Sequence, residues 1–120
     1  MTVRAIRGAT QVECDEIEHL SERTRELVQR VLDANAITTD ALISILFTST
    51  PDLRSDFPAA GARQFGLEDV PLMCAVEIDV PGALPRVVRL MAFADLDVER
   101  NEVQHVYLHG ATVLRKDLAQ

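Results

Sequence analysis

Segments of apolar residues, some alternating with polar residues and some continuous, divide the chain into short strands. A period of two predicts a strand with one buried face, and a short continuous apolar run predicts a strand buried on both faces. The segments that fit are Val3–Gly8, Leu42–Thr48, Val70–Asp79, Pro85–Phe93 and, as a further strand-like segment, Val103–Leu108. Leu42–Thr48 is mostly apolar on both sides, so we expect it to be buried on both faces. Pro81-Gly82 predicts a hairpin-like connection between the third and fourth strands.

A longer helical pattern follows the first strand. From Asp15 to about residue 34, apolar residues recur every three or four positions, which predicts an amphipathic helix packed on a sheet. Asp15 followed by Glu18 resembles a capping box at the start of this helix. Asn35 fits a left-handed residue at its end.

A second, shorter helix is predicted to begin at Pro58 and to stop at Gly66. Its small residues, Ala59–Ala62, indicate either tight helix packing or the close approach of a ligand. The order βαβαββ plus a terminal segment predicts one α+β domain over residues 1–120. We expect a mixed sheet with the helices covering one face.

Arg89 is the most informative polar residue in the pattern. Strand alternation places Val87, Arg89, Met91 and Phe93 on one face, so a permanent cation lies on an apolar surface. A guanidinium cannot lose its proton to escape burial, so it needs an anion. That anion is either Glu77, in an internal ion pair, or a ligand, and the sequence leaves both open.

The composition restricts the possible partners. Hydrophobic residues make up 48% of the chain and aromatic residues 4%, so the core is aliphatic. A formal charge of −7 and a pI near 4.8 argue against a nucleic-acid surface. Lys116 is the only lysine, so arginines must capture any anionic ligand, and their forked geometry favours carboxylates or phosphates.

Cys14 and Cys74 have neither metal-ligand spacing nor the look of a disulfide framework, and we expect free thiols in a reducing compartment. The N-terminal residues lack the apolar run of a signal peptide, and no segment approaches membrane-spanning length. A cytoplasmic protein is therefore expected.

The sequence contains no phosphate-binding glycine loop, no Ser–His–Asp elbow and no histidine-rich metal pattern. The three histidines fit structural or surface roles better. The polar residues that remain as candidates are Arg7, Arg63, Arg89, Arg115, Tyr107, Glu77 and Cys74. Such a set suits a small multi-carboxylate and a reaction that needs neither a cofactor nor a covalent intermediate.

Several blocks, in order and almost from end to end, resemble the monofunctional AroH-type chorismate mutases. The blocks are Arg4-Ala-Ile-Arg7-Gly-Ala-Thr10, Thr50-Pro-Asp-Leu53, Asp56-Phe-Pro-Ala59, Val70-Pro71 with Cys74 and Glu77, Arg86-Val-Val-Arg89, His105-Val-Tyr-Leu108 and Val113-Leu-Arg115. The resemblance implies a homotrimer, built as a pseudo-barrel, with active sites at the subunit interfaces. It also implies conversion of chorismate to prephenate, on the route to phenylalanine and tyrosine, with no cofactor and no metal.

The resemblance further implies residue roles. Arg89 would face the ether oxygen, Glu77 and Cys74 would hold the substrate hydroxyl, and Arg7 and Tyr107 would bind a carboxylate. The remaining residues implied at the site are Phe57, which would wall the ring, Arg63 and Arg115, which would close the mouth, and Ala59, Met73 and Leu114. Strict alternation puts Cys74 and Glu77 on opposite faces of their strand, so a bulge or a main-chain contact at Cys74 is needed.

The chain departs from the family pattern at Ala60, where some relatives carry lysine, at Met73, where a small polar residue is common, and at Lys116, which replaces a proline. Two other functions also fit the arginine set. One is a non-catalytic trimeric module that binds a small carboxylate, and the other is a trimeric enamine or imine hydrolase. Arg89 together with Glu77 favours the mutase, because a carboxylate sensor does not need the pair.

Overall fold

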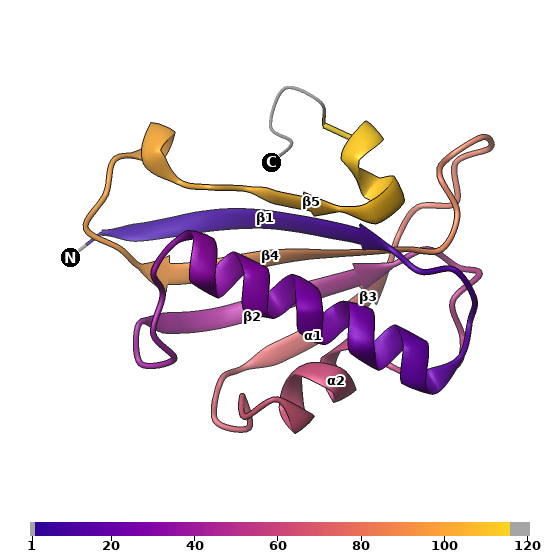
Figure 1. Ribbon diagram of the computed structural model, residues 1–120, viewed down its shortest axis with the longest axis horizontal. Helices are drawn as coiled ribbons and strands as arrows, with labels where there is room; N and C mark the ends of the chain where they lie inside the picture. Colours follow the sequence, from indigo (N-terminus) through magenta and orange to yellow (C-terminus); the bar gives the residue numbers. More distant parts are fainter. Residues whose placement is uncertain (1, 116–120) are drawn as a thin grey trace.

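The computed structural model describes residues 2–115 as one sheet layered against two helices (Figure 1). Along the chain the elements are β1 (Val3–Gln11), α1 (Ile17–Ala34), β2 (Leu42–Ser49), α2 (Pro58–Gln64), β3 (Leu72–Val76), β4 (Val87–Asp95), the 3-10 helix η1 (Arg100–Glu102), β5 (Val106–Leu108) and the 3-10 helix η2 (His109–Val113). The predicted order and the α+β class are confirmed. The expectation at Lys116 lies outside the described residues.

The strands form one mixed sheet in the order β3-β2-β4-β1-β5. β4 is antiparallel to both of its neighbours, β1 and β2, whereas β3 is parallel to β2 and β5 is parallel to β1. The chain crosses from β2 to β3 through α2, as a parallel pair requires. The predicted hairpin between the third and fourth strands is wrong, because β2 lies between β3 and β4.

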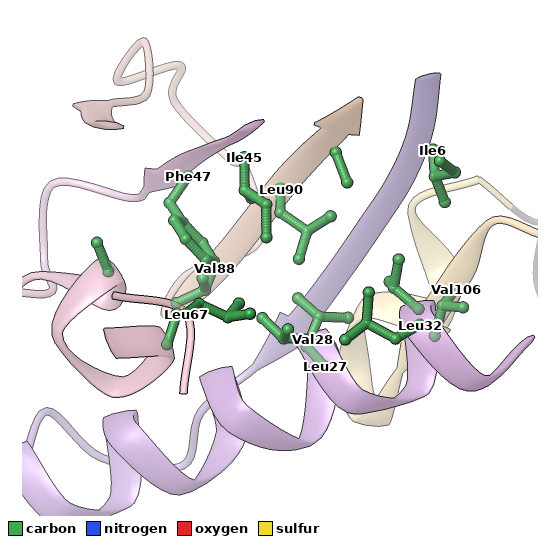
Figure 2. Packing of buried hydrophobic residues seen from close by; sticks show 14 of the residues in the cluster. Ile6, Leu27, Val28, Leu32, Ile45, Phe47, Leu67, Val88, Leu90 and Val106 are labelled. Atoms are coloured by element: carbon green, nitrogen blue, oxygen red, sulfur yellow. The ribbon is translucent and has the colours of Figure 1, made fainter. Parts of the chain in front are cut away.

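Both helices lie on the same face of the sheet, as predicted (Figure 1). The hydrophobic side chains buried between the helices and the sheet are aliphatic apart from Phe47, and Figure 2 shows Leu27 and Val28 of α1 directed toward Leu90 and Val88 of β4. All five are less than 5% exposed. Burying side chains of this size stabilises the fold by roughly 1.5–3 kcal/mol each.

The predicted end of the first strand at Gly8 is wrong. Gly8 is a paired residue inside β1, opposite Leu90 on one side and Val106 on the other, and the strand continues to Gln11. A Cβ at this position would lie 3.1 Å from side-chain carbons of Leu90 and Val31, which is closer than most such contacts. The glycine therefore allows α1 to pack closely on the sheet rather than ending the strand.

The predicted capping box of α1 is absent. The helix begins at Ile17, and its N-cap residue, Glu16, makes no side-chain capping hydrogen bond. The Asp15 carboxylate instead accepts hydrogen bonds from the backbone N–H groups of Arg54 and Ser55, each at 3.0 Å. These bonds favour the charged carboxylate and lower the pKa of Asp15. Asp15 thus ties the start of the helix to the loop after β2.

The end of α1 also differs from the prediction. Asn35 has a φ of −111°, and the left-handed residue is Ala36, with a φ of 51°. The side-chain amide of Asn35 donates to the carbonyl groups of Val31 and Gln104, while its oxygen accepts from the N–H of Gln104. Asn35 therefore joins the helix to the segment before β5.

β2 is buried on one face only, contrary to the prediction. A register irregularity between Leu42 and Ser44 shifts the alternation, so that Ile45 and Phe47 face the helices with Leu42. Leu46 is 36% exposed on the opposite face. We call that side of the sheet, away from α1 and α2, the open face.

The open face is rich in apolar side chains. η2 and Tyr107 pack over Ala9 at one end. Elsewhere within residues 2–115, Met73 remains 67% exposed and Phe93 is half-buried. No helix in this part of the chain is long and apolar enough to cross a membrane.

Candidate functional site

Arg89 lies on the open face of β4, where the alternation placed it. Its register partners are Ala9 on β1 and Thr48 on β2. Val87 on the same face is fully buried, and Met91 is half-buried. The Arg89 side chain keeps 44% of its surface exposed, so part of the guanidinium remains accessible to a ligand.

The internal ion pair considered for Arg89 is present. Nε of Arg89 lies 3.2 Å from Oε2 of Glu77, whose side chain is 15% exposed. The N–H of Nε is not directed at this oxygen, so the contact is an ion pair without hydrogen-bond geometry. The same Oε2 accepts a 2.7 Å hydrogen bond from the hydroxyl of Thr48. Glu77 therefore has two polar neighbours, one on β2 and one on β4.

A cavity of about 350 Å³ opens beside this pair. Arg7, Arg89, Tyr107 and Arg115 line it, together with the apolar side chains of Leu46, Leu90 and Met91, with Gly8 and with Thr48. Every ionisable lining group except Tyr107 is a guanidinium. The cavity thus combines positive charge with an apolar wall, which suits a compact organic anion.

His105 supports Arg7 from the adjoining segment before β5. Nδ1 of the imidazole accepts a hydrogen bond from the backbone N–H of Arg7 at 2.9 Å. This side-chain contact lies next to the Gly8–Val106 pair, where the β1–β5 pairing begins. Burial lowers the pKa of His105, and the nearby cations of Arg7 and Arg115 lower it further. A neutral ring with an unprotonated Nδ1 is the form that this bond requires.

Two of the candidate residues lie elsewhere. Phe57 and Cys74 line a separate hollow of about 410 Å³, near the loop that follows β2. Phe57 is 68% exposed, while Cys74 is half-buried and packs against the core on the helix side. The sulfur of Cys74 and the carboxylate of Glu77 therefore belong to opposite faces of the sheet, as alternation predicts. A single chain does not bring them together.

The remaining candidates, Arg63, Ala59, Met73 and Leu114, line neither cavity. Arg63 is exposed on α2, and Ala59 of the same helix is buried. Met73 lies on the open face, next to Leu46 in the β2–β3 register. Leu114 is half-buried against the cluster formed by Ala9, Tyr107 and Ala111.

Thr48 and Leu46 were missed as cavity residues. The sequence places both in an apolar run that reads as fully buried, and no local feature separates them from their neighbours. Pairing between β2 and β4 puts Thr48 opposite Arg89 and Leu46 opposite Met91. The signal that would have found them is this strand register, which depends on contacts far apart in the sequence.

Within residues 2–115, no three His, Cys, Asp or Glu side chains are grouped so that they could hold a metal ion. Cys14 and Cys74 are both free thiols.

Comparison with known proteins gives consistent matches. The family model for chorismate mutase type I matches residues 3–118. The curated chorismate mutase AroH of Thermus thermophilus is 49% identical over 117 residues, which covers 97% of this chain and 96% of that protein. The AroH protein of Bacillus subtilis is 38% identical over 120 residues, covering 99% and 94%. A solved chorismate mutase structure from Clostridium thermocellum superposes with a TM-score of 0.89 at 41% identity, covering 91% of this chain and 97% of the other.

Proposed function

The chain belongs to the chorismate mutase type I family, and from this premise we propose which of its residues carry the reaction. The protein is an isomerase that converts chorismate to prephenate, in the biosynthesis of aromatic amino acids. The reaction is unimolecular: an ether C–O bond breaks while a C–C bond forms within one molecule. The enzyme must therefore select the compact, chair-like conformer and favour the charge that develops as the ether bond breaks.

Arg89 is the residue that we assign to the ether oxygen, where negative charge grows in the transition state. Its backbone is fixed between two neighbouring strands, and Glu77 limits the freedom of its side chain at 3.2 Å. A donor held in place before the reaction loses little orientational freedom when charge appears. By analogy with oxyanion-hole deletions, such a donor lowers the barrier by about 3–4 kcal/mol.

Other polar groups in and beside the cavity fit the substrate's remaining polar atoms. We assign Arg7 and Tyr107 to a carboxylate, because both line the cavity that contains Arg89. Glu77 would accept a hydrogen bond from the substrate hydroxyl and would favour the positive charge that is left on the ring. The observation that supports the assignment is that Arg89, which lines this cavity with Arg7, Tyr107 and Arg115, lies 3.2 Å from the carboxylate of Glu77.

A complete site requires a second copy of the chain in this proposal. Phe57 and Cys74 belong to a hollow separate from the Arg89 cavity, and the open face exposes apolar side chains such as Met73. Three copies that met through their open faces would bury this surface. Such a trimer would allow Phe57, Ala59, Arg63, Met73 and Cys74 of one subunit to complete the cavity lined by Arg7, Arg89, Tyr107 and Arg115 of its neighbour. Glu77, which contacts Arg89, and Leu114, which packs against the Tyr107 cluster, would lie beside it.

The direct test is to follow the loss of chorismate absorbance with purified protein and to identify prephenate as the product. A rate well above the uncatalysed background is expected, and a rate equal to background would contradict the proposal. It would favour the alternative of a non-catalytic module that binds a small carboxylate. Free Cys14 and Cys74 favour a reducing compartment, and we propose a cytoplasmic location.

A further inference from the structure

Thr48 lies beside Arg89 and Glu77 but has no role in the proposed mechanism. It lies on β2 directly opposite Arg89 on β4, and it lines the same cavity. Its hydroxyl donates a 2.7 Å hydrogen bond to Oε2 of Glu77. A hydroxyl that donates to a carboxylate forms a charge-assisted hydrogen bond, which is stronger than a bond between neutral groups.

The local backbone explains why Glu77 needs this support. Glu77 follows the last residue of β3, and one backbone hydrogen bond, from its N–H to the carbonyl of Ser49 at 2.9 Å, continues the pairing with β2. The next residue, Ile78, is 87% exposed. The Glu77 side chain therefore projects from the end of a short edge strand, where its torsions are fixed mainly by the groups that its carboxylate contacts.

The two carboxylate oxygens of Glu77 are not equivalent. Oε2 receives the Thr48 hydroxyl and lies 3.2 Å from Nε of Arg89. Among the described residues, Oε1 has neither a hydrogen bond nor an ion pair. Oε2 is thus engaged by Thr48 and Arg89, whereas the lone pairs of Oε1 can accept a hydrogen bond from a ligand.

We propose that Thr48 is a positioning residue, which holds Oε2 of Glu77 toward Arg89 and so presents Oε1 to the hydroxyl of the substrate. This inference rests on the role of Glu77 in the proposed function. Thr48 does not need to touch the substrate. It restricts the carboxylate to one orientation before binding, so the bound substrate does not have to impose that orientation.

The test is a double-mutant cycle on kcat/KM for chorismate, with Thr48→Val, Glu77→Gln and the double variant. Valine keeps the shape of threonine and removes only the donor. We expect Thr48→Val to lower kcat/KM about 10- to 100-fold, the range for loss of a hydrogen bond to a charged group. In the Glu77→Gln background, the same substitution should change kcat/KM less than about threefold.

Two matched variants separate positioning from structure. Thr48→Ser retains the hydroxyl and should recover most of the activity lost in Thr48→Val. Thr24→Val makes the same substitution at a buried residue of α1, outside the cavity, and should leave kcat/KM unchanged. Both Thr48 variants should remain folded at the assay temperature and keep the oligomeric state of the wild type, although Thr48→Val should lower the thermal midpoint because the native state loses one hydrogen bond.

The possible outcomes distinguish this inference from the proposed function. If Glu77→Gln cripples the enzyme while Thr48→Val is fully active, the positioning role is wrong and the role of Glu77 stands. If Glu77→Gln itself is fully active, the proposed role of Glu77 fails. Equal losses from Thr48→Val in both backgrounds would overturn the inference, because Thr48 would then act independently of Glu77.

Discussion

Nε of Arg89 and Oε2 of Glu77 lie 3.2 Å apart, although the strands that lead to them are not neighbours in the sheet. Glu77 follows β3, Arg89 belongs to β4, and β2 lies between them. The carboxylate reaches Arg89 across Thr48 of the intervening strand. The pair therefore depends on the order of the strands. Its arginine, together with Thr48, lines the cavity to which we assign the chemistry.

Replacing Arg89 by lysine tests whether the guanidinium stabilises the negative charge that develops on the ether oxygen. Lysine keeps one positive charge but not the planar fork, so it cannot contact Glu77 and the substrate in the same way. We expect Arg89→Lys to lower kcat about 10²- to 10³-fold with little change in the thermal midpoint. Steady-state kinetics and thermal unfolding provide the measurements. The control is Arg30→Lys on the exposed side of α1, and near-normal turnover of Arg89→Lys would remove Arg89 from the mechanism.

Arg7 and Arg63 should differ in their effect on substrate affinity. Arg7 lines the Arg89 cavity, whereas Arg63 is exposed on α2. Truncating the group that contacts a carboxylate should raise KM more than truncating a group at the mouth of the site. We therefore expect the increase in KM to be larger for Arg7→Ala than for Arg63→Ala. The opposite order would show that the two assigned roles are exchanged.

Protonation of His105 should destabilise the fold. Burial and the cations of Arg7 and Arg115 lower the pKa of His105 below its ordinary value of 6.5, so the unfolded chain binds the proton more readily than the native state. This contribution to stability is complete above pH 6.5, and it is lost as the pH falls through the lowered native pKa. Urea unfolding of the wild type and of His105→Asn from pH 7.5 to pH 5 measures it.

Asparagine at position 105 offers an acceptor for the backbone N–H of Arg7 and does not titrate in this range. The wild type should therefore lose more stability than His105→Asn over the same pH interval. Parallel pH profiles for the two proteins would contradict the prediction, because the difference between the profiles isolates His105 from the other acidic and basic groups.

Thr24 offers a site for stabilisation. Its hydroxyl is fully buried on α1 and has no hydrogen-bond partner among the described residues. Burying an unpaired hydroxyl costs free energy, and valine has nearly the same shape without that group. Thr24→Val should raise the free energy of unfolding by about 1 kcal/mol, as measured by urea denaturation. The exposed control Thr39→Val should change it little, and a less stable Thr24→Val would mean that the hydroxyl has a partner.

The proposed trimer is tested by a charge on the open face. Phe93 pairs with Ala5 and Ser44 on that face, and the cavity does not include it. Phe93→Glu should shift the protein from trimer to monomer in size-exclusion chromatography with light scattering, because it would bury a carboxylate against apolar surface. Activity should fall with it.

The matched control is Ile17→Glu, at an exposed apolar residue of α1 on the helix side. It should leave the mass of the assembly unchanged. A monomeric wild type that still turned over chorismate would contradict the proposal that neighbouring chains share the site.

The sequence alone determined the elements, their order and the face on which Arg89 lies. These features are local, since the apolar residues of each segment recur with a period of two or of 3.6 residues. Alternation along β4 required only nine residues, and the helical spacing of α1 only eighteen. Predictions from local patterns were wrong where a residue contacts a partner far away in the sequence. Gly8 continues β1 and allows α1 to pack closely, and Asp15 binds the loop after β2 instead of capping α1.

Only the tertiary structure decided how those elements meet. Placing β2 between β3 and β4 put Thr48 beside Arg89, brought Glu77 to both of them, and left Cys74 on the other face of the sheet. Strand order is a choice among pairings that the pattern of each separate strand leaves equally possible. The strand order is fixed by the arrangement in which the two helices cover the apolar faces of all the strands, and this arrangement depends on every segment of the chain.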